Sequence, residues 1–262
     1  MEGNLAYFDE VESKHAIQVL RYGLGDEIQF TNGQGMRMKG VIEMANKQGF
    51  QASVTQTEAV ERPSELHILM AILKAGDRME WACEKITELG VSSFTLFQSD
   101  HGERAKVNME RMKKVVLSAM KQSHGSWLPT VEVLPFQEAI KSHPHIKQKY
   151  IAHCGVGDKV SMLEVLTPSA VMIGPEGDFS QNEVESAERA GWLPLNLGEQ
   201  ILRTETAAVA VADAAAAAVL EDPLETNMDM SAMVNLRRIE RTPGATGEVF
   251  IVGTGPGDPD LL

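Results

Sequence analysis

After residue 63 the chain alternates short apolar runs with amphipathic helical segments, and this alternation constrains the fold more than any other feature. The run from Leu66 to Leu73 is apolar almost throughout, as is typical of a strand buried on both faces of its sheet. An amphipathic helix is predicted to follow, with Asp77 as N-cap, Glu80 three residues on and Gly90 as its stop. The return to a strand at Val91–Gln98 then predicts an α/β domain on a parallel sheet.

The same alternation continues to about residue 220. Helices are predicted at Asn108–Ser123, from Ser180 to Gly191 and at Thr204–Leu220, and strands at Tyr150–Cys154, Ala170–Ile173 and Leu193–Leu197. The last of these helices is rich in alanine, the best helix former. Residues 63–221 are therefore expected to form one domain.

Residues 1–62 follow a different pattern, in which short alternating runs are separated by glycine-containing turns. Asn32-Gly33 between two such runs is a strong signal for a β-hairpin, and the stretch from Phe50 to Thr57 alternates again. One short helix is predicted before them, at about Glu12–Arg21. This region is expected to be a small β-barrel or sheet, and Arg62-Pro63-Ser64 marks its boundary with the α/β domain.

The cysteine content and the lack of a long apolar run disfavour several classes of protein. The chain has 262 residues and two cysteines, Cys83 and Cys154, which argues against a secreted disulfide scaffold and against a structural zinc site built on cysteines. No apolar run approaches the roughly 20 residues of a membrane span. A reducing cytoplasm, with no membrane partner, is the expected location.

The net charge of −13 argues against nucleic acid as a partner, because phosphate contacts require clustered lysine and arginine. Basic residues nevertheless cluster in one part of the chain, at Arg104, Lys106, Arg111, Lys113, Lys114 and Lys121. The position of charge is a better guide than its sum. A solvated helix face is the simpler explanation of this cluster, and a phosphate-binding surface is the alternative.

Two loops that lead from a predicted strand into a predicted helix carry the strongest functional signal. The first is Ile173–Ser180 and the second is Leu197–Ala207. In a parallel sheet both emerge at the carboxyl ends of strands, where ligands of open α/β sheets bind. Glycines let the backbone approach a ligand, and free N–H groups at helix starts bind polar groups. Neither loop is a G-x-G-x-x-G or P-loop motif, so nucleotide hydrolysis and ordinary dinucleotide binding are disfavoured, while the ligand itself stays open.

Taken as a pair, these loops resemble the two signature loops of the ribosomal RNA small subunit methyltransferase E family. The first contains Gly174-Pro175-Glu176-Gly177, then Phe179-Ser180 and Glu183, and the second contains Leu197-Gly198 and Ile201-Leu202-Arg203-Thr204-Glu205-Thr206-Ala207. Upstream, Asp77-Arg78-Met79-Glu80-Trp81 and Thr87-Glu88-Leu89-Gly90-Val91 are similar to the family's first crossover helix, and Ala119-Met120-Lys121-Gln122-Ser123 is similar to its second. The match runs in order over about residues 5–220.

The resemblance implies an α/β fold class, with a C-terminal SPOUT domain that has a parallel sheet and a deep trefoil knot, and a small N-terminal PUA-like β-barrel that binds RNA. It implies S-adenosyl-L-methionine as the cofactor, no metal, a homodimer, and methylation of N3 of a uridine in the 16S rRNA of the small ribosomal subunit. The residues that it places around the cofactor are His153, Gly174, Glu176, Gly177, Leu197, Gly198, Ile201, Leu202, Thr204, Thr206 and Ala207.

Methylation at uridine N3 requires that a weakly acidic proton leave and that negative charge on the uracil oxygens be stabilised. By the resemblance, Arg203 is the candidate for that stabilisation or for a phosphate contact. Glu205 is the candidate for orienting Arg203 or for acting as general base, and a pairing of the two that only fixes the loop is the structural alternative. The candidate RNA contacts are Arg21, Arg104, Lys106 and Lys121.

Several positions depart from the family's pattern. Gln200 stands where a basic residue is common, Asp178 replaces a frequent glycine, and His124-Gly125-Ser126-Trp127 lacks an arginine often found there. Only acidic or neutral residues precede Tyr7-Phe8, so the RNA-binding N-terminal region is expected to be shortened. These departures leave two alternatives: a methyltransferase of the same fold with another RNA target, such as a ribose 2′-hydroxyl, or a non-catalytic ribosome-binding protein.

The segment after residue 221 belongs to neither pattern. Val249–Pro259 resembles the opening strand and loop of tetrapyrrole (uroporphyrinogen) methyltransferases, but only that strand and loop are present. Residues 222–262 are therefore predicted to be a linker and an incomplete tail, disordered over most of their length.

Overall fold

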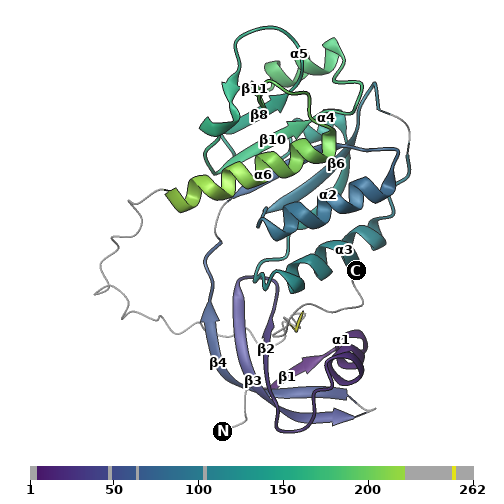
Figure 1. Cartoon of the computed structure of the whole chain (residues 1–262), viewed down its shortest axis with the longest axis vertical. Helices are drawn as coiled ribbons and strands as arrows, with labels where there is room; N and C mark the ends of the chain where they lie inside the picture. The colour runs from purple at the N-terminus through teal and green to yellow at the C-terminus, as the bar shows by residue number, and fades with distance from the viewer. Residues whose placement is uncertain (1–4, 47–48, 63–64, 103–104, 222–249, 252–262) are drawn as a thin grey trace.

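The computed structural model describes residues 5–46, 49–62, 65–102, 105–221 and 250–251. Figure 1 shows two bodies stacked along the long axis of the molecule, with an N-terminal sheet at one end and a larger α/β body at the other. None of the described helices combines the length and the apolarity that a membrane crossing requires.

The α/β body is built on a seven-stranded sheet in which every neighbouring pair of strands is parallel. The strand order is β7-β6-β5-β10-β8-β11-β9. The strands are β5 (Leu66–Ala71), β6 (Ser93–Gln98), β7 (Thr130–Pro135), β8 (Gln148–Ala152), β9 (Val160–Ser161), β10 (Ser169–Ile173) and β11 (Leu193–Asn196). The predicted α/β class and parallel sheet are confirmed, whereas the trefoil knot stays a prediction. The sequence pattern missed the two edge strands, because β7 is half-exposed and β9 has only two residues.

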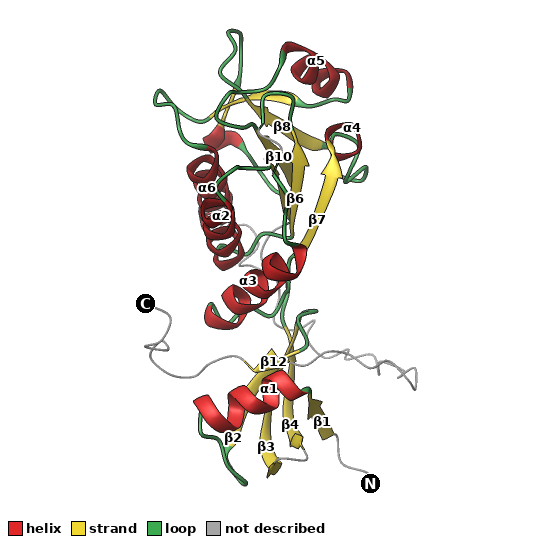
Figure 2. Ribbon diagram, turned by 90° about the vertical axis from the view of Figure 1, so that its right-hand side faces the viewer, coloured by secondary structure: helices red, strands yellow, loops and turns green. Residues whose placement is uncertain are grey.

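Alternate side chains of β5 enter two separate hydrophobic cores. Leu66, Ile68 and Met70 belong to the core formed with α2 (Gly76–Glu88), α3 (Met109–Gln122) and α6 (Thr204–Glu221). Leu69 and Ala71 point to the other face and pack with residues of α4 (Phe136–Ala139) and α5 (Gln181–Arg189). Figure 2 shows α2 and α6 on one side of the sheet and α4 on the other. Burial on both faces is the reason that this strand reads as a continuous apolar run.

The helix ends follow the sequence signals with one exception. Asn108 caps α3 by accepting a hydrogen bond from a backbone N–H, and Ser180 and Glu183 form a reciprocal capping box at α5. The prediction of Asp77 as N-cap is wrong. The N-cap of α2 is Ala75, which makes no side-chain bond, and Asp77 lies in the first turn, where its negative charge favours the helix dipole.

The N-terminal body is an antiparallel sheet in the order β1-β4-β3-β2-β12, beside one helix. Its elements are β1 (Leu5–Phe8), α1 (Glu10–Lys14) continued by the π-helical turn η1 (His15–Val19), β2 (Glu27–Thr31), β3 (Met36–Asn46), β4 (Gly49–Ala59) and β12 (Phe250–Ile251). The hairpin predicted at Asn32-Gly33 is confirmed by the pairing of β2 with β3. Phe8 packs edge-to-face on Phe30 and Phe50, with ring centroids 5.3 and 5.0 Å away. Because β1 and β12 do not pair with each other in the described chain, closure into a barrel stays a prediction.

Phe250 and Ile251 are the described residues of the C-terminal segment, and they form a short strand within the stretch Val249–Pro259 that resembles an opening strand and loop. Phe250 pairs with Thr31 and Ile251 pairs with Phe30, which places β12 on the outer edge of β2. The side chain of Phe250 is buried and lines a cavity together with Leu128 of the α/β body. The segment is therefore structured at these two positions, and the remaining residues of 222–262 lie outside the described residues.

The segment Ser126–Leu128 joins the two bodies. Trp127 forms an antiparallel bridge with Gln34, and backbone hydrogen bonds of 2.8 Å lie on either side of this bridge. The indole Nε1 of Trp127 donates to the carbonyl oxygen of Val60 at 2.9 Å. The guanidinium of Arg62 lies 4.5 Å from the centroid of the same ring, which is cation–π geometry. Trp127 therefore anchors the N-terminal sheet to the α/β body.

Candidate functional site

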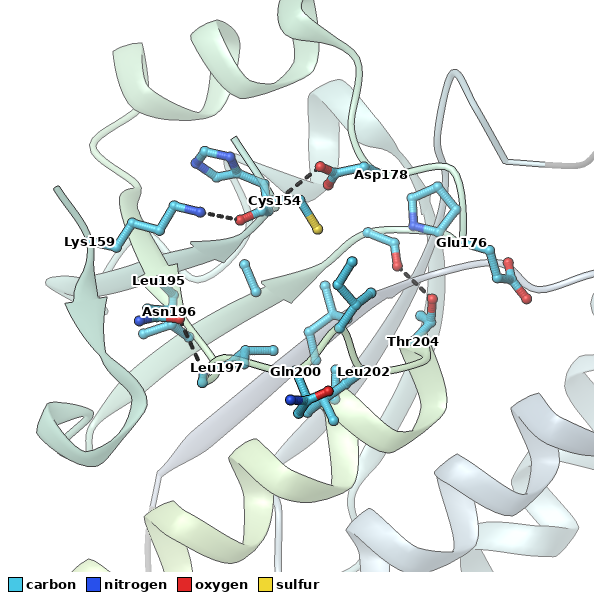
Figure 3. Close-up of a pocket in the computed structure, with 18 of the residues that line it drawn as sticks. Cys154, Lys159, Glu176, Asp178, Leu195, Asn196, Leu197, Gln200, Leu202 and Thr204 are labelled. Atoms are coloured by element: carbon cyan, nitrogen blue, oxygen red, sulfur yellow. Dashed lines mark hydrogen bonds between the residues drawn. The ribbon is translucent and has the colours of Figure 1, made fainter. Parts of the chain in front are cut away.

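A cavity of about 320 Å³ opens at the carboxyl ends of β8, β10 and β11. Its size falls in the roughly 300–1,000 Å³ range of small-molecule sites. The walls are formed by residues of the two loops singled out from the sequence and the strand ends before them, at 173–176, 178, 195–202 and 204, together with residues 152–154, Lys159 and Ala207. Figure 3 shows the side chains of these segments converging on one hollow. The two loops thus meet at one site, as their position after parallel strands predicts.

Most of the residues predicted to surround a cofactor line this cavity. They are His153, Gly174, Glu176, Leu197, Gly198, Ile201, Leu202, Thr204 and Ala207. Gly177 and Thr206 are not part of the lining. Gly177 faces His101, whose Nδ1 lies 3.1 Å from the carbonyl oxygen of Gly177, and Thr206 is exposed on α6.

Hydrogen bonds within the lining hold the loops in shape. Asp178 adopts a φ of 60°, a conformation in which glycine is the least strained residue. Its Oδ2 accepts the backbone N–H of Cys154 at 2.9 Å, which compensates for that strain and links the first loop to the end of β8. Figure 3 shows this contact. A glycine, which the resemblance implies at this position, would adopt this conformation without strain, and the aspartate adds a bond that glycine cannot make.

The second loop is shaped in a similar way. Gly198 has a φ of 114°, and its N–H donates to Oδ1 of Asn196 at 3.0 Å. Asn196 is the last residue of β11, so its side chain fixes the turn that follows the strand. This turn directs the backbone of residues 197–202 along the cavity.

His153 presents an unpartnered polar atom at the cavity. Its Nδ1 accepts the N–H of Gly155 at 3.0 Å, while its Nε2 is buried and has no hydrogen-bond partner in the described structure. Burial lowers the pKa of His153 below its ordinary value, and the nearby ammonium of Lys159 adds to the effect. The ring is therefore neutral at pH 7, and because Nδ1 is an acceptor, Nε2 carries the proton. This N–H is available to an acceptor atom of a ligand.

Lys159, Asp178 and Asn196 are among the lining residues that sequence reasoning missed. Lys159 donates to the carbonyl oxygen of His153 at 2.5 Å, and its loop contains no motif that marks it. Asp178 lies in the first loop but was noted only as a departure from the family. Asn196 ends a predicted strand, and a polar residue at that position was the available signal.

Arg78, at the start of α2, lies between two carboxylates of the loops. Its Nη1 is 3.5 Å from Oε1 of Glu176, and its Nε is 3.7 Å from Oε1 of Glu205. Glu205 is only 6% exposed, and its Oε2 has no hydrogen-bond partner among the described atoms. Arg203 is exposed and lies outside the cavity lining. In the described structure the ion-pair partner of Glu205 is thus Arg78, and not Arg203 as the sequence suggested.

The candidate RNA-contacting residues differ in their exposure and in their ion-pair partners. Arg21 and Lys106 are exposed, whereas Arg104 is outside the described residues. The ammonium of Lys121 lies 2.7 Å from Oε1 of Glu12, a carboxylate buried in the N-terminal body. Lys121 is therefore engaged in a contact between the two bodies, and among the described candidates Arg21 and Lys106 are exposed.

Comparison with known proteins assigns this fold and site to a class. The RNA methyltransferase domain family matches residues 60–216, and the RNA methyltransferase PUA domain matches residues 8–55. The chain therefore belongs to the RNA methyltransferase family. It is 28% identical over 214 residues to the ribosomal RNA small subunit methyltransferase E of Bacillus subtilis, a match that covers 75% of this chain and 83% of that protein. The resemblance noted in the sequence is confirmed.

Solved structures agree with this assignment. A probable rRNA methyltransferase from Porphyromonas gingivalis is 34% identical with a TM-score of 0.73, and the match covers 81% of this chain and 92% of that one. The ribosomal RNA small subunit methyltransferase E of Neisseria gonorrhoeae bound to S-adenosyl methionine is 27% identical with a TM-score of 0.71, covering 82% and 92% of the two chains.

Proposed function

We propose that the chain transfers a methyl group from S-adenosyl-L-methionine to N3 of a uridine in the 16S rRNA of the small ribosomal subunit. The observation that carries this proposal is the cavity formed jointly by the two loops at the ends of β8, β10 and β11. The names of the relatives and the cofactor held by the Neisseria gonorrhoeae protein support it. A cytoplasmic location accords with such a substrate.

The groups around the cavity suit this cofactor. Apolar side chains such as Leu195, Leu197 and Leu202 offer a surface for a purine ring, and the loop backbones offer peptide groups to its polar edge. The buried Nε2–H of His153 lacks an acceptor that a ligand atom would supply.

The cofactor supplies an electrophilic methyl group when it is bound. The protein must hold uridine N3 in line with that group and stabilise the negative charge that spreads onto the uracil oxygens as the N3 proton leaves. Arg203 stands between the lining residues Leu202 and Thr204 and is exposed, so it is placed to meet a base or a phosphate that approaches the cavity. In this proposal Arg203 stabilises the uracil oxygens or binds a phosphate.

Glu205 takes a positioning role in the same proposal. It is buried, it does not line the cavity, and one of its oxygens faces Arg78. These features favour holding Arg78 and the first turn of α6 in place over accepting the N3 proton. The Arg78 guanidinium in turn neutralises Glu176 at the rim of the cavity.

The proposal also includes a homodimer and a surface that contacts the RNA. Leu163, Leu166 and Ile201 are large apolar side chains that are 81%, 56% and 87% exposed, and Ile201 lies at the cavity itself. Such exposure supports a homodimer in which the partner covers this region. Arg21 and Lys106 are the described candidates for phosphate contacts.

The test is to incubate the purified chain with methyl-labelled S-adenosylmethionine and small ribosomal subunits that lack uridine-N3 methylation, and then to identify the labelled nucleoside. Label in N3-methyluridine is the expected result, and subunits already methylated at N3 serve as the control that should take up none. Label in a 2′-O-methylated nucleoside would overturn the target. Intact cofactor binding without any label would favour a non-catalytic ribosome-binding protein.

A further inference from the structure

A cluster of histidines lies at the end of the sheet opposite the cofactor cavity. Glu65 directly precedes β5, His67 is the second residue of that strand, and His145 lies in the loop between α4 and β8. Glu65 and His67 are two residues apart in an extended chain, so their side chains share one face of the sheet. Because all strands are parallel, this cluster is at their amino ends, whereas the cavity is at their carboxyl ends.

The three side chains of the cluster lie close enough together to hold one metal ion. Nε2 of His145 and Nε2 of His67 lie 3.0 and 3.4 Å from the same oxygen of Glu65, and all three ligand atoms lie within 4.8 Å of one another. Two ligands on a tetrahedral zinc ion, at the usual bond lengths of about 2.0–2.2 Å, are separated by about 3.4 Å. We propose that Glu65, His67 and His145 bind a Zn²⁺ ion, with a water molecule at the fourth position.

The surroundings of His67 orient it as a ligand. Its Nδ1 lies 2.7 Å from the hydroxyl of Ser93, the residue paired with it on the neighbouring strand β6. When this hydroxyl accepts the Nδ1 proton, the lone pair of the ring is on Nε2, which faces Glu65. Such an outer hydrogen bond is the usual support of a metal-bound histidine.

His143 adds a second support. Its ring stacks on His67 with the centroids 3.9 Å apart and the planes 23° apart. The backbone of His143 adopts a φ of 53°, a left-handed conformation that side-chain-bearing residues rarely take. Backbone of this kind persists where its surroundings over-determine it, and here the ring of His143 packs on the ring of the proposed ligand His67.

The three proposed ligands differ in solvent exposure, and an ion can reach the site from the exposed side. His67 is buried, Glu65 is half-buried, and the side chain of His145 is 60% exposed. His145 can therefore complete the site by a small rotation without any change in the core. A bound ion would tie the start of β5 to the loop before β8, so its expected effect is structural. The resemblance implies no metal, and this site is independent of the cofactor cavity.

The experiment is a calorimetric titration of the untagged, EDTA-treated full chain with Zn²⁺ alone. One ion per chain is expected, with a dissociation constant in the micromolar range or tighter, together with a rise in Tm that depends on the Zn²⁺ concentration. His145→Ala should weaken binding at least about 100-fold, because loss of outer contacts alone costs about 10- to 100-fold. Glu65→Gln should weaken it comparably while still accepting hydrogen bonds from both histidines.

The control is His124→Asn, which removes an exposed histidine outside the cluster and suits the φ of 57° at that position. It should bind Zn²⁺ like the unmodified chain. A chain without saturable Zn²⁺ binding would overturn the proposal, and so would unchanged binding by either His145→Ala or Glu65→Gln. Because His145 is exposed, its variant is expected to fold, and the circular dichroism spectrum of each variant checks this.

Discussion

The hydroxyl of Thr204 donates to the carbonyl oxygen of Gly174 at 2.8 Å, and this bond joins the two loops that form the cavity. Thr204 is the first residue of α6, and Gly174 directly follows the central strand β10. Both residues line the cavity, and Thr204 is only 3% exposed. The shape of the cofactor site therefore depends on a buried bond between segments that lie 30 residues apart.

Replacing Thr204 by valine keeps the shape of the side chain and removes this bond. The carbonyl of Gly174 is then left without its donor in a buried place, which costs about 1–3 kcal/mol of folding free energy. Because the two loops also lose their connection, we expect S-adenosylmethionine to bind about tenfold more weakly, a change of ~1.4 kcal/mol. Calorimetry measures the affinity, and urea unfolding measures the stability. Thr204→Ser retains the hydroxyl and should behave nearly as the unmodified chain, whereas equal effects of the two variants would contradict this role.

Replacing Gly35 by alanine tests the contact between the N-terminal sheet and the α/β body. A Cβ placed at Gly35 would lie 2.2 Å from the ring of Trp127, and the residue has a φ of 85°. Gly25 has nearly the same φ, 87°, but a Cβ there would have nothing within 4 Å. Gly25→Ala should therefore cost only the backbone strain of about 1–2 kcal/mol. Gly35→Ala should cost about 1–3 kcal/mol more, because the Trp127 ring must move. Urea unfolding of both variants checks this, and equal losses would show that Trp127 does not hold the junction.

The sequence predicted the elements whose residue pattern dictates one local structure. The apolar run Leu66–Leu73 predicts a strand with both faces buried, which β5 confirms at Leu66–Ala71, and Ser180 with Glu183 specifies a helix start through two reciprocal bonds. It failed where the outcome depends on distant segments. The edge strand β9 exists because β11 lies beside it, and Phe250–Ile251 form β12 because β2 offers a free edge.

The residues of the site also divide into those that a local sequence pattern predicts and those that depend on distant segments. The two loops were found because their glycines and their position after strands are visible in the sequence, and their residues do line one cavity. Lys159 reaches the loops only through the folding of a separate segment, so no local pattern marks it. Arg78 lies in a segment that carries the resemblance, but its contacts with Glu176 and Glu205 depend on the folding of distant segments. A pairing of Arg203 with Glu205 that only fixes the loop was one of the alternatives that the sequence left open. Arg203 precedes α6 and is exposed, whereas Glu205 lies in the first turn of α6, is buried and faces Arg78.

The low pKa of His153 gives cofactor binding a defined pH dependence. Because burial lowers that pKa below the ordinary value of about 6.5, the ring stays neutral as the pH falls from 8 to roughly 6.5. Below that range a proton enters at Nδ1, removes the bond from the N–H of Gly155, and puts a positive charge beside a cationic cofactor. We expect the dissociation constant of S-adenosylmethionine to stay constant from pH 8 to 6.5 and to rise below it.

Calorimetry at a series of pH values measures this dependence. His153→Gln should bind the cofactor more weakly at every pH and should flatten the rise at low pH. The control His124→Asn changes a histidine outside the cavity and should leave the profile unchanged. A rise that begins well above pH 6.5 would show that the ring is not shielded as the structure indicates.

Substitution of Arg203 should distinguish an effect on S-adenosylmethionine binding from an effect on methyl transfer. Because it is exposed and lies outside the cavity lining, Arg203→Ala should leave the affinity for S-adenosylmethionine within about twofold, the change expected when no direct contact is lost. The rate of methyl transfer should fall about 100-fold or more, the usual cost of removing one donor that stabilises developing negative charge. Single-turnover transfer to small ribosomal subunits measures the rate, and calorimetry measures the affinity.

The control for Arg203 is Arg189→Ala, which removes an exposed arginine of α5 away from the cavity and should change neither quantity. Arg203→Lys then distinguishes the two proposed roles. A lysine keeps the charge that a phosphate contact needs, but it lacks the planar fork that can donate two bonds to a uracil edge. Recovery of the rate by lysine would favour the phosphate contact. A rate that stays low with unchanged subunit binding would favour direct stabilisation of the uracil oxygens, and a normal rate in Arg203→Ala would exclude both.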